Sequence, residues 1–228
     1  MKQLLYVTHS AGYRHEILPY SHEVMERLGA ESGAFAATCA DDVAAVDWSP
    51  AGLSRFDAIA FCTTGELPMN DDAKQNLIES VRRDGTGFVG IHNATDTFYQ
   101  FAPYGEMVGG YFNGHPWHQE VGIVVEDRDH PSTRHLPEHF RIHDEIYTHR
   151  NWSREKTHVL LRLDNTSVDL EKAAGKRDDN DFAMAWCHAF GAGRVFYTAL
   201  GHGKETWGDL RFHQHLLGGI RWTMRDAD

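Results

Sequence analysis

Histidine is the residue type in this sequence that most clearly indicates chemical function. The 228 residues include 16 histidines, about one residue in fourteen, and they are scattered along the chain. Imidazole titrates near neutral pH and is the commonest metal ligand in proteins. This content therefore predicts a site for proton transfer or for metal binding.

Three histidines lie within three residues of the ends of segments that are typical of buried strands: His9, His92 and His202. In an open parallel sheet, ligands bind at the carboxyl ends of the strands. A lone histidine at such a place is often only a hydrogen-bonded loop residue. Because three of them occupy equivalent topological positions, we expect these side chains to meet in one crevice at the rim of the sheet.

The segment GFVGIHNATD, residues 87–96, has the layout of a nucleophile elbow, in which a strand turns sharply into a helix. His92 occupies the protruding position, where a hydrolase would carry serine or cysteine. Cys62 and Cys187 lie inside apolar segments, where cysteine behaves as a small buried side chain. These observations argue against a cysteine-dependent glutamine amidotransferase.

Composition excludes several other classes. The chain has 22 Lys and Arg against 33 Asp and Glu, a net charge of −11, so we expect no nucleic-acid partner. It has no apolar run of about 18 residues, and its start does not resemble a signal peptide, so we expect no membrane association. Three cysteines without CxxC spacing favour a reducing cytoplasm, and the absence of a P-loop or GxGxxG motif argues against a nucleotide cofactor.

The elements that must position the histidines predict an α/β fold. Up to residue 92, apolar strand-like runs alternate with helical periodicity, which is typical of a parallel sheet covered on both faces. The later segments alternate apolar and polar residues, and residues 191–193, Gly-Ala-Gly, join the last two, so the sheet should become mixed. We expect one domain over residues 1–228. The predicted strands are residues 4–7, 35–39, 58–62, 87–91, 119–126, 140–147, 158–163, 183–189 and 194–199.

Five segments carry a family resemblance: residues 8–15 (THSAGYRH), 90–96 (GIHNATD), 109–116 (GGYFNGHP), 144–147 (DEIY) and 193–202 (GRVFYTALGH). Together they resemble the ThuA-like family, which is associated with trehalose utilisation. The resemblance implies a class I glutamine amidotransferase-like fold, a flavodoxin-like three-layer α/β sandwich without the amidotransferase cysteine. It also implies that His202 and Glu205 stand where an amidotransferase keeps its catalytic His and Glu.

Several further residues are candidates for substrate binding. Arg14 offers forked donors for a hydroxyl or carboxylate, although it could simply pair with a surface carboxylate. Trp117, flanked by His115 and His118, could stack on a sugar face or belong to a surface turn. Asp96 could orient His92, or only stabilise the start of the following helix.

Asp144 and Glu145 are adjacent carboxylates in a predicted strand. Neighbouring strand residues point to opposite faces, so at most one of them should reach the site and the other should be solvated.

We therefore predict an enzyme of carbohydrate catabolism that acts on a sugar or keto-sugar, such as a trehalose-type disaccharide derivative, by histidine acid/base chemistry. Isomerase, lyase and hydrolase activities all stay open. The predicted catalytic residues are His92, His202, His15 and Glu145. The predicted substrate-binding residues are His9, Arg14, Asp96, His115, Trp117, His118 and Asp144.

Three further hypotheses accompany this prediction. A divalent metal such as zinc could assist the chemistry, bound by His9, His92 and His202. The scaffold could instead be a non-catalytic sugar- or effector-binding module. A homo-oligomer could form through the closing helix with Trp207 and Trp222, although burial in the core is the simpler expectation for these tryptophans.

Overall fold

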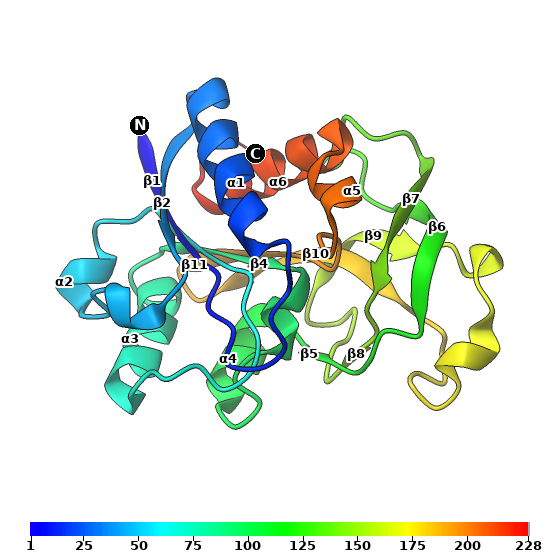
Figure 1. The fold of residues 1–228 in the computed structure, drawn as a ribbon, viewed down its shortest axis with the longest axis horizontal. Helices are drawn as coiled ribbons and strands as arrows, with labels where there is room; N and C mark the ends of the chain where they lie inside the picture. Colours follow the sequence, from blue (N-terminus) through cyan, green and yellow to red (C-terminus); the bar gives the residue numbers. More distant parts are fainter. Residues whose placement is uncertain (228) are drawn as a thin grey trace.

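A computed structural model describes residues 1–227, which form a nine-stranded sheet between two layers of helices (Figure 1). The strand order is β2-β1-β3-β4-β11-β10-β9-β6-β7. The strands are β1 (Lys2–Val7), β2 (Phe35–Ala40), β3 (Ala58–Phe61), β4 (Gly87–Ile91), β6 (Trp117–Val125), β7 (His139–Ile146), β9 (His158–Leu163), β10 (Ala183–Phe190) and β11 (Gly193–Thr198), and a separate pair is formed by β5 (Tyr111–Phe112) and β8 (His149–Arg150).

The sheet is parallel on one side and antiparallel on the other. Strands β2, β1, β3, β4 and β11 run parallel to one another. From β11 onward, β10, β9, β6 and β7 pair antiparallel. The predicted α/β class, with a parallel first half and a mixed second half, is confirmed.

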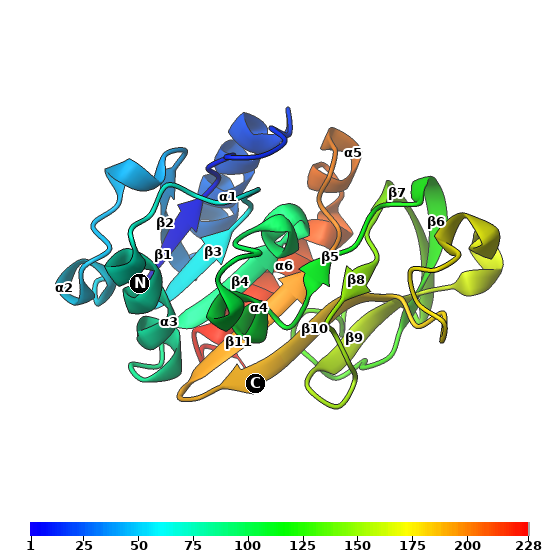
Figure 2. The ribbon, with the colours of Figure 1, turned by 90° about the horizontal axis from the view of Figure 1, so that it is seen from below.

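Helices cover both faces of the parallel half. In Figures 1 and 2, α1 and α6 lie on one face and α3 and α4 on the other. Because both faces are covered, β3 and β4 are buried at every position. The helices are α1 (Leu18–Ser32), α2 (Pro50–Leu53), α3 (Asp71–Arg82), α4 (Ala102–Val108), α5 (Lys204–Trp207) and α6 (Leu210–Thr223), with short 3-10 turns η1 (Val43–Ala45), η2 (His92–Asp96), η3 (Asn165–Ser167) and η4 (Leu170–Ala173).

The parallel strands end at one edge of the sheet, and three of the loops that leave this edge carry the histidines of interest. These loops follow β1, β4 and β11, and they contain His15, His92 and His202. The antiparallel strand β7 brings Asp144 and Glu145 toward the same region, because both contact the His202 loop. The topology alone therefore gathers side chains from four distant parts of the sequence.

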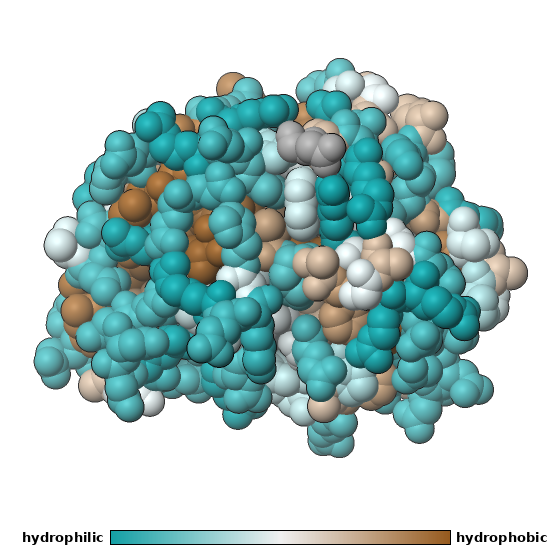
Figure 3. All heavy atoms as spheres, turned by 180° about the vertical axis from the view of Figure 1, so that it is seen from behind, coloured by the Kyte–Doolittle hydropathy of each residue, from teal (hydrophilic) through white to brown (hydrophobic). Residues whose placement is uncertain are grey.

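The surface is largely polar. The face in Figure 3 is mostly hydrophilic, and apolar side chains show there only in scattered areas. Trp207 is fully buried, and Trp222 is half-buried beneath the guanidinium of Arg194, so Trp207 at least belongs to the core. Within residues 1–227, no helix has both the length and the apolar character that crossing a bilayer requires.

Candidate active site

His92 stands on a strained turn directly after β4. Its φ is 44°, in the left-handed region that residues other than glycine rarely adopt. Gly90 precedes it where a Cβ would lie 2.8 Å from the Tyr197 ring, so a small residue is needed beside the turn. The elbow geometry matches the layout of the sequence. The His92 side chain, however, is buried rather than protruding, because other loops close over it.

Glu145 lies at the centre of a cluster of imidazoles. Its Oε2 is 3.2 Å from His202 Nδ1 and 3.5 Å from His92 Nε2, while its Oε1 is 3.3 Å from His115 Nδ1. The two ring nitrogens of His92 and His202 are themselves 3.3 Å apart. Burial by itself would raise the pKa of Glu145, but its close contacts with the His202 and His92 imidazoles outweigh burial and hold the pKa well below its usual value. The carboxylate is therefore negative at any physiological pH.

Asp144 fixes the loop that carries His202. Its carboxylate accepts hydrogen bonds from the backbone N–H groups of Gly201 (2.7 Å) and His202 (3.0 Å). The prediction that one of the two adjacent carboxylates is solvated is wrong, because Asp144 is only 2% exposed. Alternation does send Asp144 and Glu145 to opposite sides of β7. The His202 loop reaches both of them, through its backbone on Asp144 and through its imidazole on Glu145.

His15 completes the cluster from the loop after β1. Its ring centroid lies 5.3 Å from that of His92 and 5.2 Å from that of His202. The Asn93 side-chain amide contacts His15 Nδ1 at 3.1 Å. Burial, followed by the neighbouring charges of His92 and His202, lowers the pKa of His15 to about 3, so this imidazole is neutral. In contrast, the hydrogen bond to Glu145 raises the pKa of His202 against its partial burial.

His9 does not join these residues, so the expectation that His9, His92 and His202 share one crevice is wrong for His9. Its Nδ1 accepts a hydrogen bond from the Val43 backbone N–H at 3.3 Å and lies 3.3 Å from Asp42. The reason is the path of the chain. Strand β1 pairs with β2 as well as β3, and the residues directly after β1 still face the β2 side; only further along does the loop bring His15 to β4.

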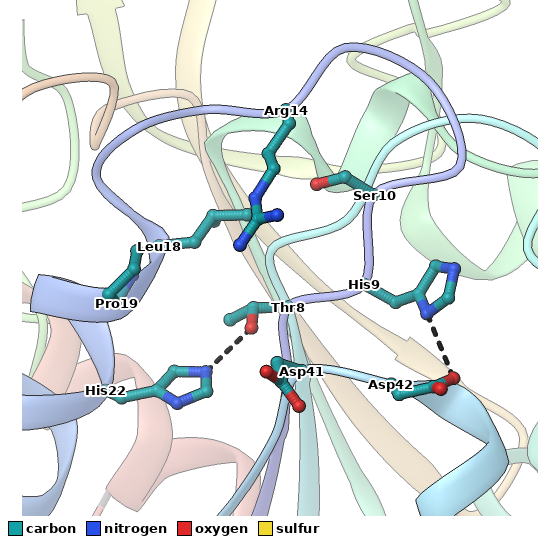
Figure 4. Close-up of a pocket in the computed structure, with 9 residues that line it drawn as sticks. All are labelled: Thr8, His9, Ser10, Arg14, Leu18, Pro19, His22, Asp41 and Asp42. Atoms are coloured by element: carbon teal, nitrogen blue, oxygen red, sulfur yellow. Dashed lines mark hydrogen bonds and ion pairs between the residues drawn. The ribbon is translucent and has the colours of Figure 1, made fainter.

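His9 and Arg14 instead line a separate polar cavity of about 550 Å³ (Figure 4). The Arg14 side chain extends into this cavity toward Thr8, and Asp41 and Asp42 face it from the loop after β2. The cavity is lined by Thr8, His9, Ser10, Arg14, Leu18, Pro19, His22, Asp41 and Asp42.

Trp117 is not available to a substrate. It is 1% exposed, and its indole N–H donates to the Asp169 carbonyl oxygen at 2.9 Å. Strand β6 begins at Trp117, two residues earlier than predicted, and strand alternation turns this ring inward while His118 stays exposed. The His118 ring centroid lies 5.0 Å from that of His202, at the outer side of the cluster.

The exposed aromatic ring beside the cluster is Tyr13, which the sequence reasoning missed. It is 68% exposed, and its ring edge packs on His15 at a centroid distance of 4.9 Å. Its position in the sequence could have indicated a site residue, because Tyr13 lies between Gly12 and Arg14 in a loop that leaves the carboxyl end of a parallel strand.

Two further carboxylates differ from expectation. Glu205, with its side chain 76% exposed, pairs with His143 at 3.2 Å, so the carboxylate beside His202 is Glu145 instead. Asp96 accepts a hydrogen bond from the Tyr99 hydroxyl at 2.5 Å, and burial raises its pKa. His92 is oriented by the Ala199 carbonyl oxygen, which accepts from Nδ1–H at 2.7 Å.

A cavity of about 340 Å³ opens beside the cluster, and His15 and His202 are the imidazoles that line it. His92 and Glu145 lie behind them with side chains 1% and 10% exposed. A molecule bound there would meet a neutral imidazole on one side and a carboxylate-paired imidazole on the other. The cavity is lined by Tyr13, His15, Glu16, Ile17, His202, Gly203 and Lys204.

Comparisons with known proteins agree with this architecture. The model of the ThuA family, described as trehalose utilisation, matches residues 3–223. A ThuA-like protein from Parabacteroides merdae is similar at 18% identity and TM-score 0.77, over 99% of this chain and 91% of that one. A ThuA-like protein from Bacteroides uniformis gives 21% identity and TM-score 0.76, over 97% and 91% of the two chains.

A more distant similarity connects the fold to the amidotransferases. The structure of PurLQS from Thermotoga maritima matches at 14% identity and TM-score 0.59, over 97% of this chain and 99% of that chain. A search among curated proteins gives no match. At such identities, structural similarity shows the fold, a glutamine amidotransferase-like α/β sandwich, and leaves function to be argued from the site.

Proposed function

Because the chain belongs to the ThuA family, described as trehalose utilisation, we propose that it is a carbohydrate-catabolism enzyme that moves protons on a sugar or keto-sugar. The observation that supports this most is the convergence of His15 and His202 on one cavity, with Glu145 directly behind. Sugars offer hydroxyl protons, and an oxidised sugar has a carbonyl group that acidifies the neighbouring C–H. Imidazoles suit both kinds of proton transfer.

The two imidazoles that face the cavity have opposite environments, and this assigns their roles. His15 is neutral, so one of its ring nitrogens carries a lone pair, and we assign to it the removal of the proton from the substrate carbon next to the carbonyl. His202 is held by Glu145, which stabilises its protonated form, so it donates a proton to the carbonyl oxygen. The product is an enediol. For an isomerisation, the proton on His15 moves to the former carbonyl carbon while the other enediol hydroxyl gives its proton to His202. For an elimination, the enediol hydroxyl returns its proton to His202, and the leaving group departs from the adjacent carbon with the proton held by His15.

Variants of the two imidazoles test this function. The assay offers trehalose-type disaccharides and their keto forms, and follows both product formation and exchange of substrate C–H protons with deuterated solvent. We expect His15→Ala and His202→Ala to lower turnover by about 10²- to 10⁴-fold. His139→Ala, an exposed histidine at the start of β7, is the matched control and should keep full activity. Near-normal turnover in both cavity variants would contradict the proposal.

A second candidate function is binding of a sugar or effector without turnover. The separate cavity around Arg14 favours it, because this cavity offers arginine, histidine and aspartate side chains for hydroxyl groups away from the histidine cluster. Under this alternative, calorimetry detects binding that Arg14→Ala abolishes, while the same compounds are never converted. Conversion of any bound compound decides in favour of the enzyme.

A further inference from the structure

Three atoms of the cluster, His92 Nε2, His202 Nδ1 and Glu145 Oε2, face one another closely enough to share a bound cation. His92 Nδ1 lies 2.7 Å from the Ala199 carbonyl oxygen, which can only accept, so Nδ1 carries the hydrogen. In the neutral imidazole, Nε2 then offers a lone pair, and it faces Glu145 Oε2 and His202 Nδ1. One shared proton satisfies the contact between Glu145 and His202 but leaves His92 Nε2 without a donor. A cation at the common point would satisfy all three atoms.

The spacing of these atoms matches that of ligands around a small metal ion. The three edges of the triangle are 3.2, 3.3 and 3.5 Å. Tetrahedral zinc with bonds of about 2.0–2.1 Å has ligand–ligand edges of about 3.3–3.4 Å. His15 offers a further nitrogen, and the ligand atoms of His15, His92, Glu145 and His202 all lie within 4.8 Å of one another.

We propose that His92 Nε2, His202 Nδ1 and Glu145 Oε2 bind one divalent transition-metal ion of the zinc class, with His15 facing the open fourth position. Three protein ligands and one open position are the arrangement of a catalytic zinc site. The ligand set differs from that predicted from sequence, since Glu145 takes the place of His9.

The groups around the ligands hold them as a metal site requires. The Ala199 carbonyl fixes the ring orientation of His92, and the Asp144 carboxylate fixes the backbone at His202. His115 engages the other oxygen of Glu145, which leaves Oε2 for the ion. Such partners of the ligands orient them and tune their affinity.

This inference deepens the proposed function and rests on it only for the role of the ion. In the cavity beside the cluster, the ion would polarise a sugar carbonyl or hydroxyl oxygen. His202 is then a ligand, so the ion takes over the polarisation of the carbonyl oxygen that the metal-free mechanism assigns to His202, and proton transfer falls to His15. Binding of the metal itself does not depend on any particular substrate.

Metal titration tests the site directly. Protein produced without an affinity tag is dialysed against a chelator and titrated with Zn²⁺ by calorimetry, and with Co²⁺ by visible absorption, which is much stronger in four-coordinate than in six-coordinate sites. We expect one ion per chain. His92→Ala, His202→Ala and Glu145→Gln should each weaken binding by at least about 100-fold. His9→Ala is the matched control and should retain one ion per chain, because His9 lies in the other cavity.

The outcomes separate this inference from the proposed function. Binding far below one ion per chain in the wild type, or unchanged binding in folded His92→Ala and His202→Ala proteins, overturns the metal site. If one variant fails to fold in a thermal melt, the others and the wild-type Co²⁺ spectrum still decide. One bound ion per chain without turnover of any sugar contradicts the proposed enzyme function and supports the metal site. Turnover that survives complete removal of metal supports the enzyme function and overturns the role of the ion in it.

Discussion

At the scale of single residues, the cluster works because each imidazole has a partner that limits what it can do. Ala199 fixes the hydrogen of His92 on Nδ1, Glu145 engages His202, and Asn93 contacts His15. His15, His92, His202 and Glu145 could be named from sequence, since each lies at or near the end of a strand. Their partners could not, because a backbone carbonyl 107 residues away leaves no pattern in the sequence.

The two aromatic residues of the region should respond oppositely to truncation. Tyr13 is 68% exposed beside the cavity, so Tyr13→Ala should leave unfolding free energy within about 0.5 kcal/mol of wild type. Tyr13 lines the cavity, so we expect its ring to stack on a bound sugar, and Tyr13→Ala should lose about 1 kcal/mol of this contact, roughly a five-fold rise in KM. Trp117 is 1% exposed, so Trp117→Ala should cost about 3–5 kcal/mol of stability. Urea unfolding and steady-state kinetics on both variants check this, and a normal KM in Tyr13→Ala would exclude the stacking role.

At the scale of elements, regular hydrophobic periodicity is enough to predict the strands, but it does not predict the irregular segments between them. The strand His158–Leu163 has the predicted limits, and β4 also matches residue for residue. Strand β6 was placed two residues too late, because the His-Pro-Trp-His segment resembles a turn until its burial against Asp169 is known. The path of the loop after β1 could not be predicted from local sequence either, because long-range contacts determine it. That loop decides whether His9 or His15 enters the site.

The elbow after β4 stores backbone strain that a substitution can measure. His92 holds a φ of 44°, which costs about 1 kcal/mol or more for a residue with a Cβ and little for glycine. Both His92→Ala and His92→Gly remove the imidazole, so the difference between them reports the backbone alone. We expect the glycine variant to be more stable than the alanine variant by about 1 kcal/mol in urea unfolding. Glycine is normally the more destabilising of the two, so a less stable His92→Gly would show an unstrained turn.

At the scale of the whole molecule, two groups of histidines have different consequences. One group forms the candidate site. A second group is buried elsewhere in the structure, and burial lowers the pKa of His215 and His149 to about 3 and that of His130 to about 4. His215 Nδ1–H donates to the Ser132 carbonyl oxygen, 2.9 Å away, and the ring packs on Phe196.

The buried histidines should make the fold sensitive to mild acid. In the folded state they stay neutral down to about pH 3–4, whereas in the unfolded chain they take up protons below their ordinary pKa of about 6.5. The unfolded state therefore binds more protons between these limits, and stability falls as the pH decreases from about 6.5. Over most of this window, each such histidine lowers the free energy of unfolding by about 1.4 kcal/mol for every unit by which the pH falls. Above pH 7 it adds no pH dependence, because it is neutral in both the folded and the unfolded state.

Urea unfolding at pH 7.5, 6.5, 5.5 and 4.8 measures this slope, and His215→Gln isolates one histidine. Glutamine preserves a donor near the Ser132 carbonyl but does not titrate, so the variant should lose some stability at pH 7.5 and show a slope about 1.4 kcal/mol per pH unit shallower than wild type below pH 6. His139→Gln, on the surface, should follow the wild-type curve. Parallel curves for wild type and His215→Gln would mean that His215 takes up its proton in the folded state, which its 2% exposure and apolar neighbours oppose.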